Sequence, residues 1–374
     1  MNCLHLMPQD SLINIDLIKE INKHFPNNNH LFVLKHFRKE ASHITNCVID
    51  SSLFSLAELN QAHKEYSTIF LHSLFFSDKE IRSMSDELAK KIIWCVWGHD
   101  LYLVRRAKRL TLSDILHKSV HCVKKLGRGT YIRIHRDNAE TARKVRLFKC
   151  VLIGYPYDKV MLCKKYGKNL NVNIAPYFSD FNKTKMNSLL QTQVMKTHAG
   201  TNVLLGHCGF HFIQHEKYLQ KLSAYQHENI HVFMVLSYGA STEEIDRIQN
   251  TADKALGRDK YTIIKDIMSK DTYHDFLSNI DIAIFPYKHQ SGVFNTVLLS
   301  YLGKKLYFSS HGVLYKGFKS LNLPVYDCEK IGRINFSEFI SPAPAVNRDS
   351  LLYDIYNNDL NVQRWSNVFE DYCS

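Results

Sequence analysis

Two glycine-containing loops in the second half of the chain have the residue types that bind phosphate. Residues 206–215 follow the apolar run 203–205, and residues 287–296 follow the apolar run 282–285. Each loop is predicted to join a strand to a helix. Free backbone N–H groups and the helix dipole both favour an anion at such a junction. Two such loops in one α/β half therefore indicate a ligand with a diphosphate, such as a nucleotide sugar. Their spacing matches neither the dinucleotide fingerprint nor the P-loop.

The residues expected to hold the donor come from these two loops and from the turn at 237–241. A histidine beside a phosphate loop can donate a hydrogen bond to the ligand, and a tyrosine on a turn can stack on a base or a sugar. The candidate donor-binding residues are Gly206, His207, Gly209, His215, Ser237, Tyr238, Gly239, Tyr287, Gln290, Ser291, Gly292, Asn295 and Thr296.

The donors at the start of the predicted helix after Gly292 suit a diphosphate leaving group, because the charge that develops there needs preorganised hydrogen bonds. No D-x-D pair stands where it would bind Mn²⁺ or Mg²⁺. His207, His211 and His215 have helical spacing, but the glycines make this stretch a loop, and no further ligands complete a metal set. We therefore expect neither a metal nor an organic cofactor.

The segment Trp97-Gly-His-Asp in the first half is the candidate catalytic site. It ends a predicted strand, and ligands of open α/β sheets bind at the carboxyl ends of strands. Asp100, with His99 beside it, is placed to act as the general base that removes the proton of a sugar hydroxyl. The alternative is that Asp100 caps the turn that follows it.

Strand-like and helix-like segments alternate along both halves of the chain, a pattern typical of mainly parallel sheets covered by helices. Strands are predicted at 31–34, 68–71, 92–97 and 151–153, and then at 203–205, 231–236, 261–264, 282–285 and 305–308. We predict an α/β fold of the GT-B type, with two Rossmann-like domains facing across a cleft. The expected boundaries are 1–190 for an acceptor- and membrane-facing domain, 199–345 for a nucleotide-sugar-binding domain, and 346–374 for a helical tail, with a linker over 182–198.

The net charge of +12 is concentrated in one window. Residues 105–149 contain fourteen bases and three acids, a net +11. Such a surface predicts a polyanionic partner, which could be anionic lipid head groups, a phosphorylated lipid or nucleic acid, with a solvated helix face as the alternative. Nucleic acid is not expected, because no stacking pattern or binding motif accompanies the bases. The membrane- or acceptor-binding candidates are Arg105, Arg106, Lys108, Arg109, Lys124, Lys125 and Arg128.

The nine cysteines are scattered without a C-x-x-C pair, which favours a reducing compartment. We find neither a signal peptide nor an apolar run long enough to span a membrane. These features predict a cytoplasmic protein.

Three blocks of the sequence resemble the family of TDP-N-acetylfucosamine:lipid II N-acetylfucosaminyltransferases of enterobacterial common antigen synthesis. These blocks are Trp97-Gly-His-Asp-Leu-Tyr102, Leu204-Leu-Gly-His-Cys-Gly209 with His215, and Gln290-Ser-Gly-Val-Phe-Asn-Thr296, the last followed by Leu323-Pro-Val325. The resemblance extends over about two-thirds of the chain. It implies transfer of a deoxyamino sugar from a dTDP-sugar to a polyprenyl-diphosphate-linked saccharide, with inversion of the anomeric centre. The implied location is the cytoplasmic face of a bacterial inner membrane, where the protein would be peripheral and its basic surface would dock on the anionic lipids of the inner membrane.

The chain departs from the family pattern at His207, Cys208 and Asn295. All three lie where the donor is expected, so a UDP- or GDP-sugar remains an alternative donor. A non-catalytic protein that binds an anionic glycolipid on the same scaffold is the alternative from another functional class.

Overall fold

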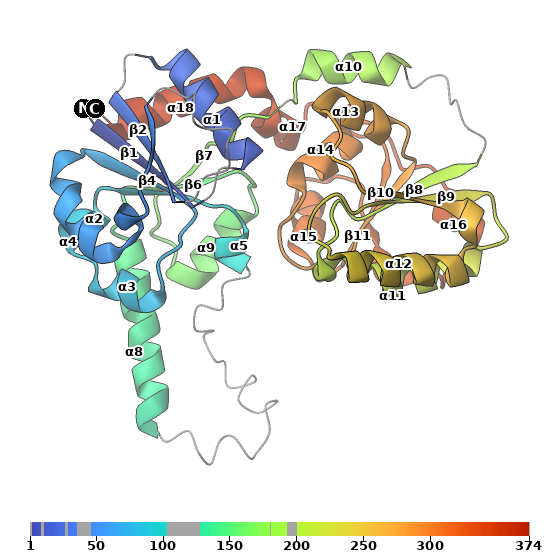
Figure 1. The fold of residues 1–374 in the computed structure, drawn as a ribbon, viewed down its shortest axis with the longest axis horizontal. Helices are drawn as coiled ribbons and strands as arrows, with labels where there is room; N and C mark the ends of the chain where they lie inside the picture. The colour runs from blue at the N-terminus through green and yellow to red at the C-terminus, as the bar shows by residue number, and fades with distance from the viewer. Residues whose placement is uncertain are drawn as a thin grey trace. The chain divides into compact units, whose positions relative to one another are not determined.

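The structure, a computed structural model, describes residues 2–8, 11–26, 29–35, 46–102, 128–179, 181–192 and 200–373. The chain folds into two compact units (Figure 1). Unit 1 comprises Met1–Phe178 and Leu360–Ser374, and unit 2 comprises Ser179–Asp359. Each unit has its own parallel sheet, so the predicted α/β fold with two Rossmann-like domains is confirmed.

Unit 1 is built on a seven-stranded parallel sheet in the order β3-β2-β1-β4-β5-β6-β7. Its strands are β1 (Asn2–Met7), β2 (Asn29–Leu34), β3 (Cys47–Ile49), β4 (Thr68–His72), β5 (Ile92–Cys95), β6 (Cys150–Ile153) and β7 (Val172–Ile174). Its helices are α1 (Leu12–His24), α2 (Leu56–Ala62), α3 (Asp78–Ser83), α4 (Asp86–Ala89), α5 (His99–Tyr102), α8 (Arg128–Val145), α9 (Asp158–Tyr166) and most of α18 (Asn358–Cys373).

Unit 2 has a six-stranded parallel sheet in the order β10-β9-β8-β11-β12-β13. Its strands are β8 (Thr201–Leu205), β9 (Ile230–Val235), β10 (Tyr261–Ile264), β11 (Ile282–Phe285), β12 (Lys305–Phe308) and β13 (Tyr326–Asp327). Its helices are α10 (Lys183–Thr192), α11 (His215–Leu222), α12 (Thr242–Ala255), α13 (Lys270–Ser278), α14 (Val293–Tyr301), α15 (Val313–Ser320), α16 (Phe336–Ile340) and α17 (Leu351–Tyr356). The strand order reverses between β8 and β11, which is where open α/β sheets bind ligands.

The central strands are largely buried because helices cover both faces of each sheet. In β4, β11 and β12 every residue is buried, as expected for a parallel sheet. On one face of the unit 1 sheet, Ile18 of α1 packs in the same cluster as Trp365 and Phe369 of α18. The far C-terminal helix is therefore part of the core of the first unit.

Strand β1 lies at the centre of the unit 1 sheet, although the sequence did not indicate a strand there. It pairs with both β2 and β4. His5 interrupts its apolar pattern and is nevertheless fully buried. This is possible because His5 forms hydrogen bonds with His72 at 3.0 Å and His30 at 2.9 Å, which offset the cost of its burial.

The unit boundaries differ from the predicted ones, because residues 179–190, expected in the first domain, pack on unit 2. Lys183 forms an ion pair with Asp354 at 2.6 Å, and Asn187 accepts a hydrogen bond from the hydroxyl of Tyr301 at 2.6 Å. The predicted linker over 182–198 begins with helix α10 instead. The predicted tail over 346–374 is shared between the units, since α17 packs in unit 2 and α18 in unit 1.

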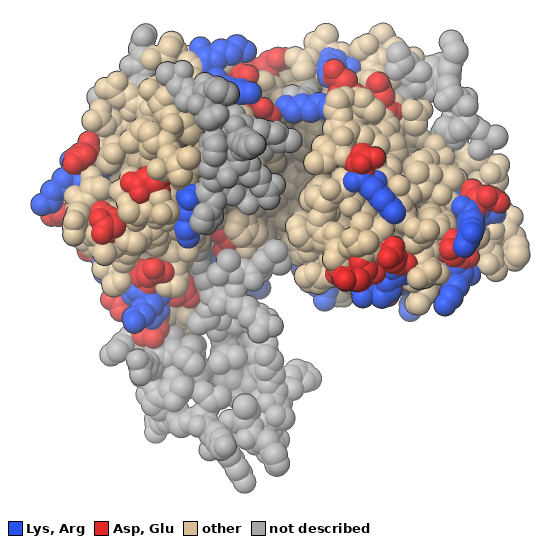
Figure 2. All heavy atoms as spheres, viewed as in Figure 1, with Lys and Arg blue, Asp and Glu red and all other residues tan. Residues whose placement is uncertain are grey.

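The predicted basic surface lies largely outside the described residues. Arg105, Arg106, Lys108, Arg109, Lys124 and Lys125 are outside them, and for Arg128 the backbone alone is described, at the start of α8. On unit 2, basic and acidic side chains lie close together on the face seen in Figure 2. Among the described residues, no helix is both long and apolar enough to cross a bilayer.

Candidate active site

Two helices that follow the central strands of unit 2 begin without a side-chain cap. Helix α11 follows β8 and α14 follows β11, and their N-cap residues, Gln214 and Gly292, are both in the left-handed region and form no side-chain capping bond. The neighbouring helices α12 and α13 are capped by Ser241 and Ser269. The first-turn N–H groups of α11 and α14 therefore have no side-chain cap and can serve an anion.

His207 holds the loop before α14 against the end of β8. The hydroxyl of Tyr287 donates to the carbonyl of Ser291 at 2.8 Å, so it accepts from Nδ1–H of His207 at 3.3 Å. Nε2 of His207 then accepts from the Ser291 hydroxyl at 3.2 Å. Burial is the main cause that lowers the pKa of His207, to about 4, so the ring is neutral at pH 7. The predicted ligand His207 thus positions the start of α14.

Gly292 is required at this position by two features of the loop. Its φ of +56° lies in the region that L side chains rarely adopt, and a Cβ there would lie 2.8 Å from Nδ1 of His207. The ring therefore packs directly on the glycine backbone, and a side chain at 292 would push the start of α14 away from β8.

His215 is the buried group in this region with an unused polar atom. It is the first residue of α11 and only 4% exposed. One ring nitrogen bonds to the backbone of Leu205, and Nε2 has no hydrogen-bond partner among the described residues. Burial lowers the pKa of His215 to about 4, so at pH 7 the ring is neutral. Nε2 can accept a ligand hydroxyl, or take a proton when a phosphate is bound.

The N–H groups of the two predicted phosphate-loop glycines are used within the protein. Gly206 N–H donates to Ile284 at 3.0 Å as part of the sheet, and Gly209 N–H donates to Tyr238 at 2.8 Å. Both glycines are needed for close packing, since a Cβ at Gly206 would lie 2.5 Å from Ile213 and one at Gly209 would lie 2.4 Å from Ala240. Gly206 and Gly209 therefore shape the loop, whereas the N–H groups that could bind an anion lie at the starts of α11 and α14.

The turn after β9 presents aromatic side chains to solvent, with half-buried Ser237 at its start. Tyr238 is 48% exposed and Phe210 is 42% exposed, and their rings meet edge to face with centroids 6.0 Å apart. A Cβ at Gly239 would lie 2.9 Å from the Phe210 ring, so this glycine lets the ring lie on the turn. The position of Tyr238 fits the predicted contact with a base or a sugar, and Phe210 extends the same surface.

The remaining predicted donor residues differ in how accessible they are. Gln290 and Asn295 are half-buried beside the start of α14, and the amide of Asn295 bonds to Tyr273. Thr296 is fully buried and its hydroxyl donates to Val293 of its own helix at 2.8 Å. It is therefore not available to a ligand, because position 296 faces the core of the unit.

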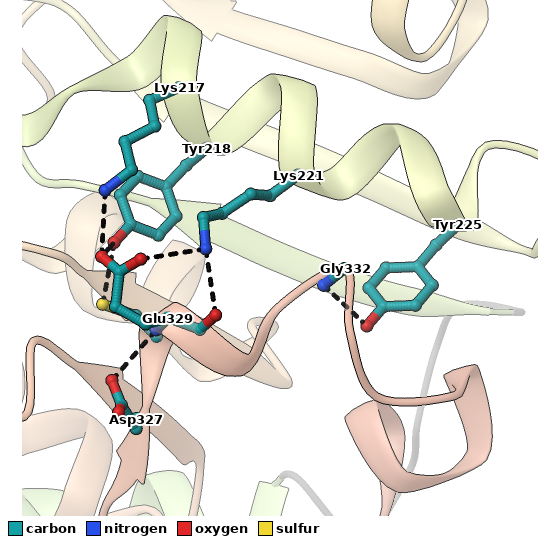
Figure 3. Close-up of polar contacts among 8 residues, drawn as sticks. Lys217, Tyr218, Lys221, Tyr225, Asp327, Glu329 and Gly332 are labelled. Carbon is teal, nitrogen blue, oxygen red and sulfur yellow. Dashed lines mark hydrogen bonds and ion pairs between the residues drawn. The ribbon is translucent and has the colours of Figure 1, made fainter.

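Helix α11 is anchored at its middle by Glu329 of the short helix η7 (Cys328–Lys330) (Figure 3). The carboxylate accepts from Lys217 at 3.0 Å, from the hydroxyl of Tyr218 at 2.8 Å and from Lys221 at 3.1 Å. Burial acts to raise the pKa of Glu329, but these donors outweigh it and lower the pKa to about 2. The uncapped start of α11 is thus held in place by bonds from side chains in the first two turns of the helix.

In unit 1, Asp100 is fully buried, and its two oxygens accept three N–H groups. These are Nε1 of Trp94 at 2.7 Å, the backbone N–H of Leu74 at 2.8 Å and the backbone N–H of Trp97 at 3.1 Å. A general base needs a lone pair directed at the substrate. All three donors precede Asp100 in the sequence, so its carboxylate fastens the turn before α5 to the loop after β4 and does not cap the turn that follows it, which was the alternative prediction.

His99, the second predicted catalytic residue, is exposed beside this turn. Its Nε2 lies 3.3 Å from Oγ of Ser73, which follows β4 and has a φ of +92°. A serine in this conformation is strained, and such residues cluster at functional sites. No local pattern marks Ser73 in the sequence, because its partner is 26 residues away at the end of another strand.

Residues 171–349 match the sequence model of a family described as 4-alpha-L-fucosyltransferase, glycosyl transferase group 56. The whole chain also resembles solved structures of low sequence identity. A glycosyltransferase from Rickettsia africae superposes with a TM-score of 0.59 at 10% identity, covering 100% of this chain and 98% of that one. HepE from Anabaena, solved with UDP and glucose, superposes with a TM-score of 0.57 at 10% identity, and the match covers 99% of each chain. An Escherichia coli trehalose-6-phosphate protein with a bound UDP-fluoroglucose superposes with a TM-score of 0.54 at 9% identity, and the match covers 100% of this chain and 99% of that one.

The family match and the fold agree. The two parallel units correspond to the GT-B fold of the solved glycosyltransferases, and the matched segment includes all of the unit 2 sheet. The chain is a glycosyltransferase enzyme.

Proposed function

We propose that this glycosyltransferase moves a deoxyamino sugar of the N-acetylfucosamine type from a dTDP-sugar to a polyprenyl-diphosphate-linked saccharide. The fucosyltransferase description of the matched family supports the sugar class. The three sequence blocks that resemble the common-antigen transferases support the nucleotide and the lipid-linked acceptor.

The observation that carries the donor site is the pair of uncapped helices at the point where the strand order of unit 2 reverses. First-turn N–H groups of α14 and α11 would bind the two phosphates, and Nε2 of His215 would meet a donor hydroxyl or phosphate oxygen. The exposed rings of Tyr238 and Phe210 would support the base or the sugar. This assignment needs no metal, because helix N-termini stabilise the charge of the leaving group.

On the acceptor side, His99 is the better general base because it is exposed and Asp100 is not. If Nε2–H of His99 donates to Ser73, the lone pair of Nδ1 is free to take the proton of the acceptor hydroxyl. The acceptor oxygen then bonds to the anomeric carbon while the bond from that carbon to the diphosphate oxygen breaks. The electron pair leaves with the nucleoside diphosphate, and a single displacement of this kind inverts the anomeric centre.

The basic window over 105–149 supports docking on the anionic inner leaflet, where a polyprenyl-linked acceptor is embedded. Each exposed base near such a surface contributes about 1 kcal/mol. The proposed location is therefore the cytoplasmic face of the inner membrane, with peripheral attachment.

The test is a thermal-shift titration with dTDP, UDP, GDP, CMP and ATP, each without and with Mg²⁺. A nucleotide at about 100 times its dissociation constant adds about 2.7 kcal/mol to the free energy of unfolding. We expect selective stabilisation by dTDP that does not depend on Mg²⁺. A preference for UDP or GDP would indicate that the donor is a UDP- or GDP-sugar. No response to any nucleotide would favour the glycolipid-binding alternative.

A matched pair of variants makes this test specific. Gly292→Ala and Gly303→Ala place a side chain at φ values of +56° and +76°, but only at 292 does the new Cβ meet another group, the His207 ring. The left-handed conformation costs each variant about 1–2 kcal/mol. We expect Gly303→Ala to keep the nucleotide response and Gly292→Ala to lose it. Equal responses would remove the start of α14 from the donor site.

A further inference from the structure

Two aromatic side chains at the carboxyl edge of the unit 1 sheet are partly exposed but turn their polar atoms inward. Trp97 follows β5 and Tyr177 follows β7, and each is half-buried. Nε1–H of the indole donates to the Tyr177 hydroxyl oxygen at 2.8 Å, and the rings meet edge to face with centroids 5.4 Å apart. The pair is thus joined through the atoms that would otherwise bind water.

The Tyr177 hydroxyl is held in turn by a chain of buried histidines. It bonds to Nδ1 of His72, Nε2 of His72 lies 3.0 Å from Nδ1 of His5, and Nε2 of His5 lies 2.9 Å from Nδ1 of His30. Burial lowers the pKa of His72 to about 3 and the pKa of His5 well below its usual range. The rings of His72 and His5 are therefore neutral at pH 7, and the hydrogen bond between them contains a single proton.

This arrangement is the opposite of the usual one for exposed aromatic residues. Tyrosine and tryptophan at a surface normally bury the ring and direct the polar tip to water. The hydroxyl of Tyr177 bonds to His72, and the indole N–H of Trp97 bonds to that hydroxyl. The exposed part of these two side chains therefore consists of ring carbon. The π face carries partial negative charge and suits the slightly positive C–H groups on the face of a pyranose ring.

The position of the pair fits the acceptor side of the reaction. Trp97 is two residues from His99, and its backbone N–H donates to Asp100, which is fixed in the core. The rings and the exposed imidazole thus belong to the same turn at the carboxyl end of β5.

We propose that Trp97 and Tyr177 form a stacking platform for a pyranose ring of the acceptor saccharide, held rigid by the His72–His5–His30 chain. The proposal rests on the proposed function for the identity of the acceptor. Trp97 and Tyr177 would contact the sugar, and His72 is a positioning residue that acts through Tyr177.

A binding experiment tests the platform without nucleotide or turnover. The other two tryptophans, Trp94 and Trp365, are fully buried, so the emission change of the full chain on ligand binding reports mainly on Trp97. We would titrate wild type, Tyr177→Ala and Tyr66→Ala with the methyl glycosides of N-acetylglucosamine, N-acetylmannosamine, glucose and galactose. Tyr66 is the control, a half-buried tyrosine just before β4, at the opposite edge of the same sheet.

We expect a saturable change in emission with at least one glycoside in wild type and Tyr66→Ala, and its loss in Tyr177→Ala, which keeps Trp97. No response of wild type to any of the four, or an equal response in Tyr177→Ala, would overturn the platform. Failure of the proposed function would show separately, as absence of nucleotide binding in the thermal-shift titration.

Kinetics with the lipid-linked acceptor give the second readout. Trp97→Ala should raise the acceptor KM about tenfold or more, the size of one lost stacking contact and its burial, with the donor dissociation constant unchanged. Trp97→Phe should restore most of the affinity, because it keeps a ring. His72→Leu should raise the acceptor KM less than Trp97→Ala and leave the donor constant unchanged. An unchanged acceptor KM in Trp97→Ala would overturn the proposal.

Discussion

The carboxyl edges of the two parallel sheets are built from the same kind of β–α junctions but end in opposite chemistry. In unit 1 the helices after β1 and β4 begin at Ser11 and Ser77, which accept from their own first turns. In unit 2 the helices after β8 and β11 begin at Gln214 and Gly292 with no side-chain cap. Unit 1 thus satisfies these two helix starts with its own side chains, whereas unit 2 leaves its two central starts open.

Under the proposed function, this difference places the two substrates at different edges. Uncapped helix starts attract an anion, which is the character of a nucleoside diphosphate. The unit 1 edge offers an exposed imidazole and ring carbon instead, which suit a sugar hydroxyl and a sugar face. Four predictions test this contrast.

The largest expected effect is on the rate, from His99 in unit 1. His99→Gln should lower kcat by about 10²–10⁴-fold, the usual contribution of a general base, and should leave the donor dissociation constant unchanged. Steady-state kinetics with saturating acceptor, together with nucleotide titration, measure both. A variant that retains wild-type kcat would exclude His99 as the base.

The next effect is on stability, from Asp100. Asp100→Ala removes a buried carboxylate and leaves three N–H groups without an acceptor, so the free energy of unfolding should fall by about 3–5 kcal/mol. The free energy of unfolding should fall less in Asp100→Asn, because the remaining amide oxygen still accepts a hydrogen bond. Denaturant unfolding at pH 7 measures the loss. If Asp100→Asn kept full stability and lost all activity, Asp100 would be catalytic after all.

The third effect is the pH dependence of stability that the histidines of unit 2 produce. The folded pKa of His207 and His215 is about 4, below the unfolded value near 6.5. The unfolded chain therefore binds more protons between these values, and stability should fall as the pH drops from 6.5 toward 4, by about 1.4 kcal/mol per unit for each histidine. Urea unfolding at pH 7.5 and 5.5 should show a smaller loss in His215→Gln than in wild type. Equal losses would mean that His215 is not neutral in the fold.

The smallest effect comes from the helices that do have caps. Ser77 in unit 1 and Ser241 in unit 2 each form a capping box. Ser77→Ala and Ser241→Ala should each cost about 1 kcal/mol, and neither should change the nucleotide dissociation constant. Weaker nucleotide binding in Ser241→Ala would extend the anion site to α12 and weaken the contrast between open and capped starts.

The class of fold and the positions of the two glycine-containing loops follow from the sequence alone. Apolar runs such as 261–264, 282–285 and 305–308 are strands with the same bounds in the structure. In 282–285 and 305–308 the continuous apolar run reflects burial on both faces of the sheet, a property that each segment carries in its own residues. The glycine at 292 likewise marked a local backbone requirement that the structure bears out.

Contacts between distant residues could not be predicted in this way. A central strand at 2–7 was missed because His5 looks polar until His30 and His72 are placed beside it. Asp100, expected to be the base, is fully buried and already accepts hydrogen bonds from Trp94 and Leu74, which lie far from it or on another element of the unit.

The tertiary structure alone therefore decided which polar groups are consumed and which stay open. Gly206, Gly209 and Thr296 have donors of the predicted types, but the fold uses them internally, whereas His215 and the starts of α11 and α14 remain available. The physical reason is that a hydrogen bond depends on which partner lies within about 3 Å in space, and spacing along the chain does not specify that partner.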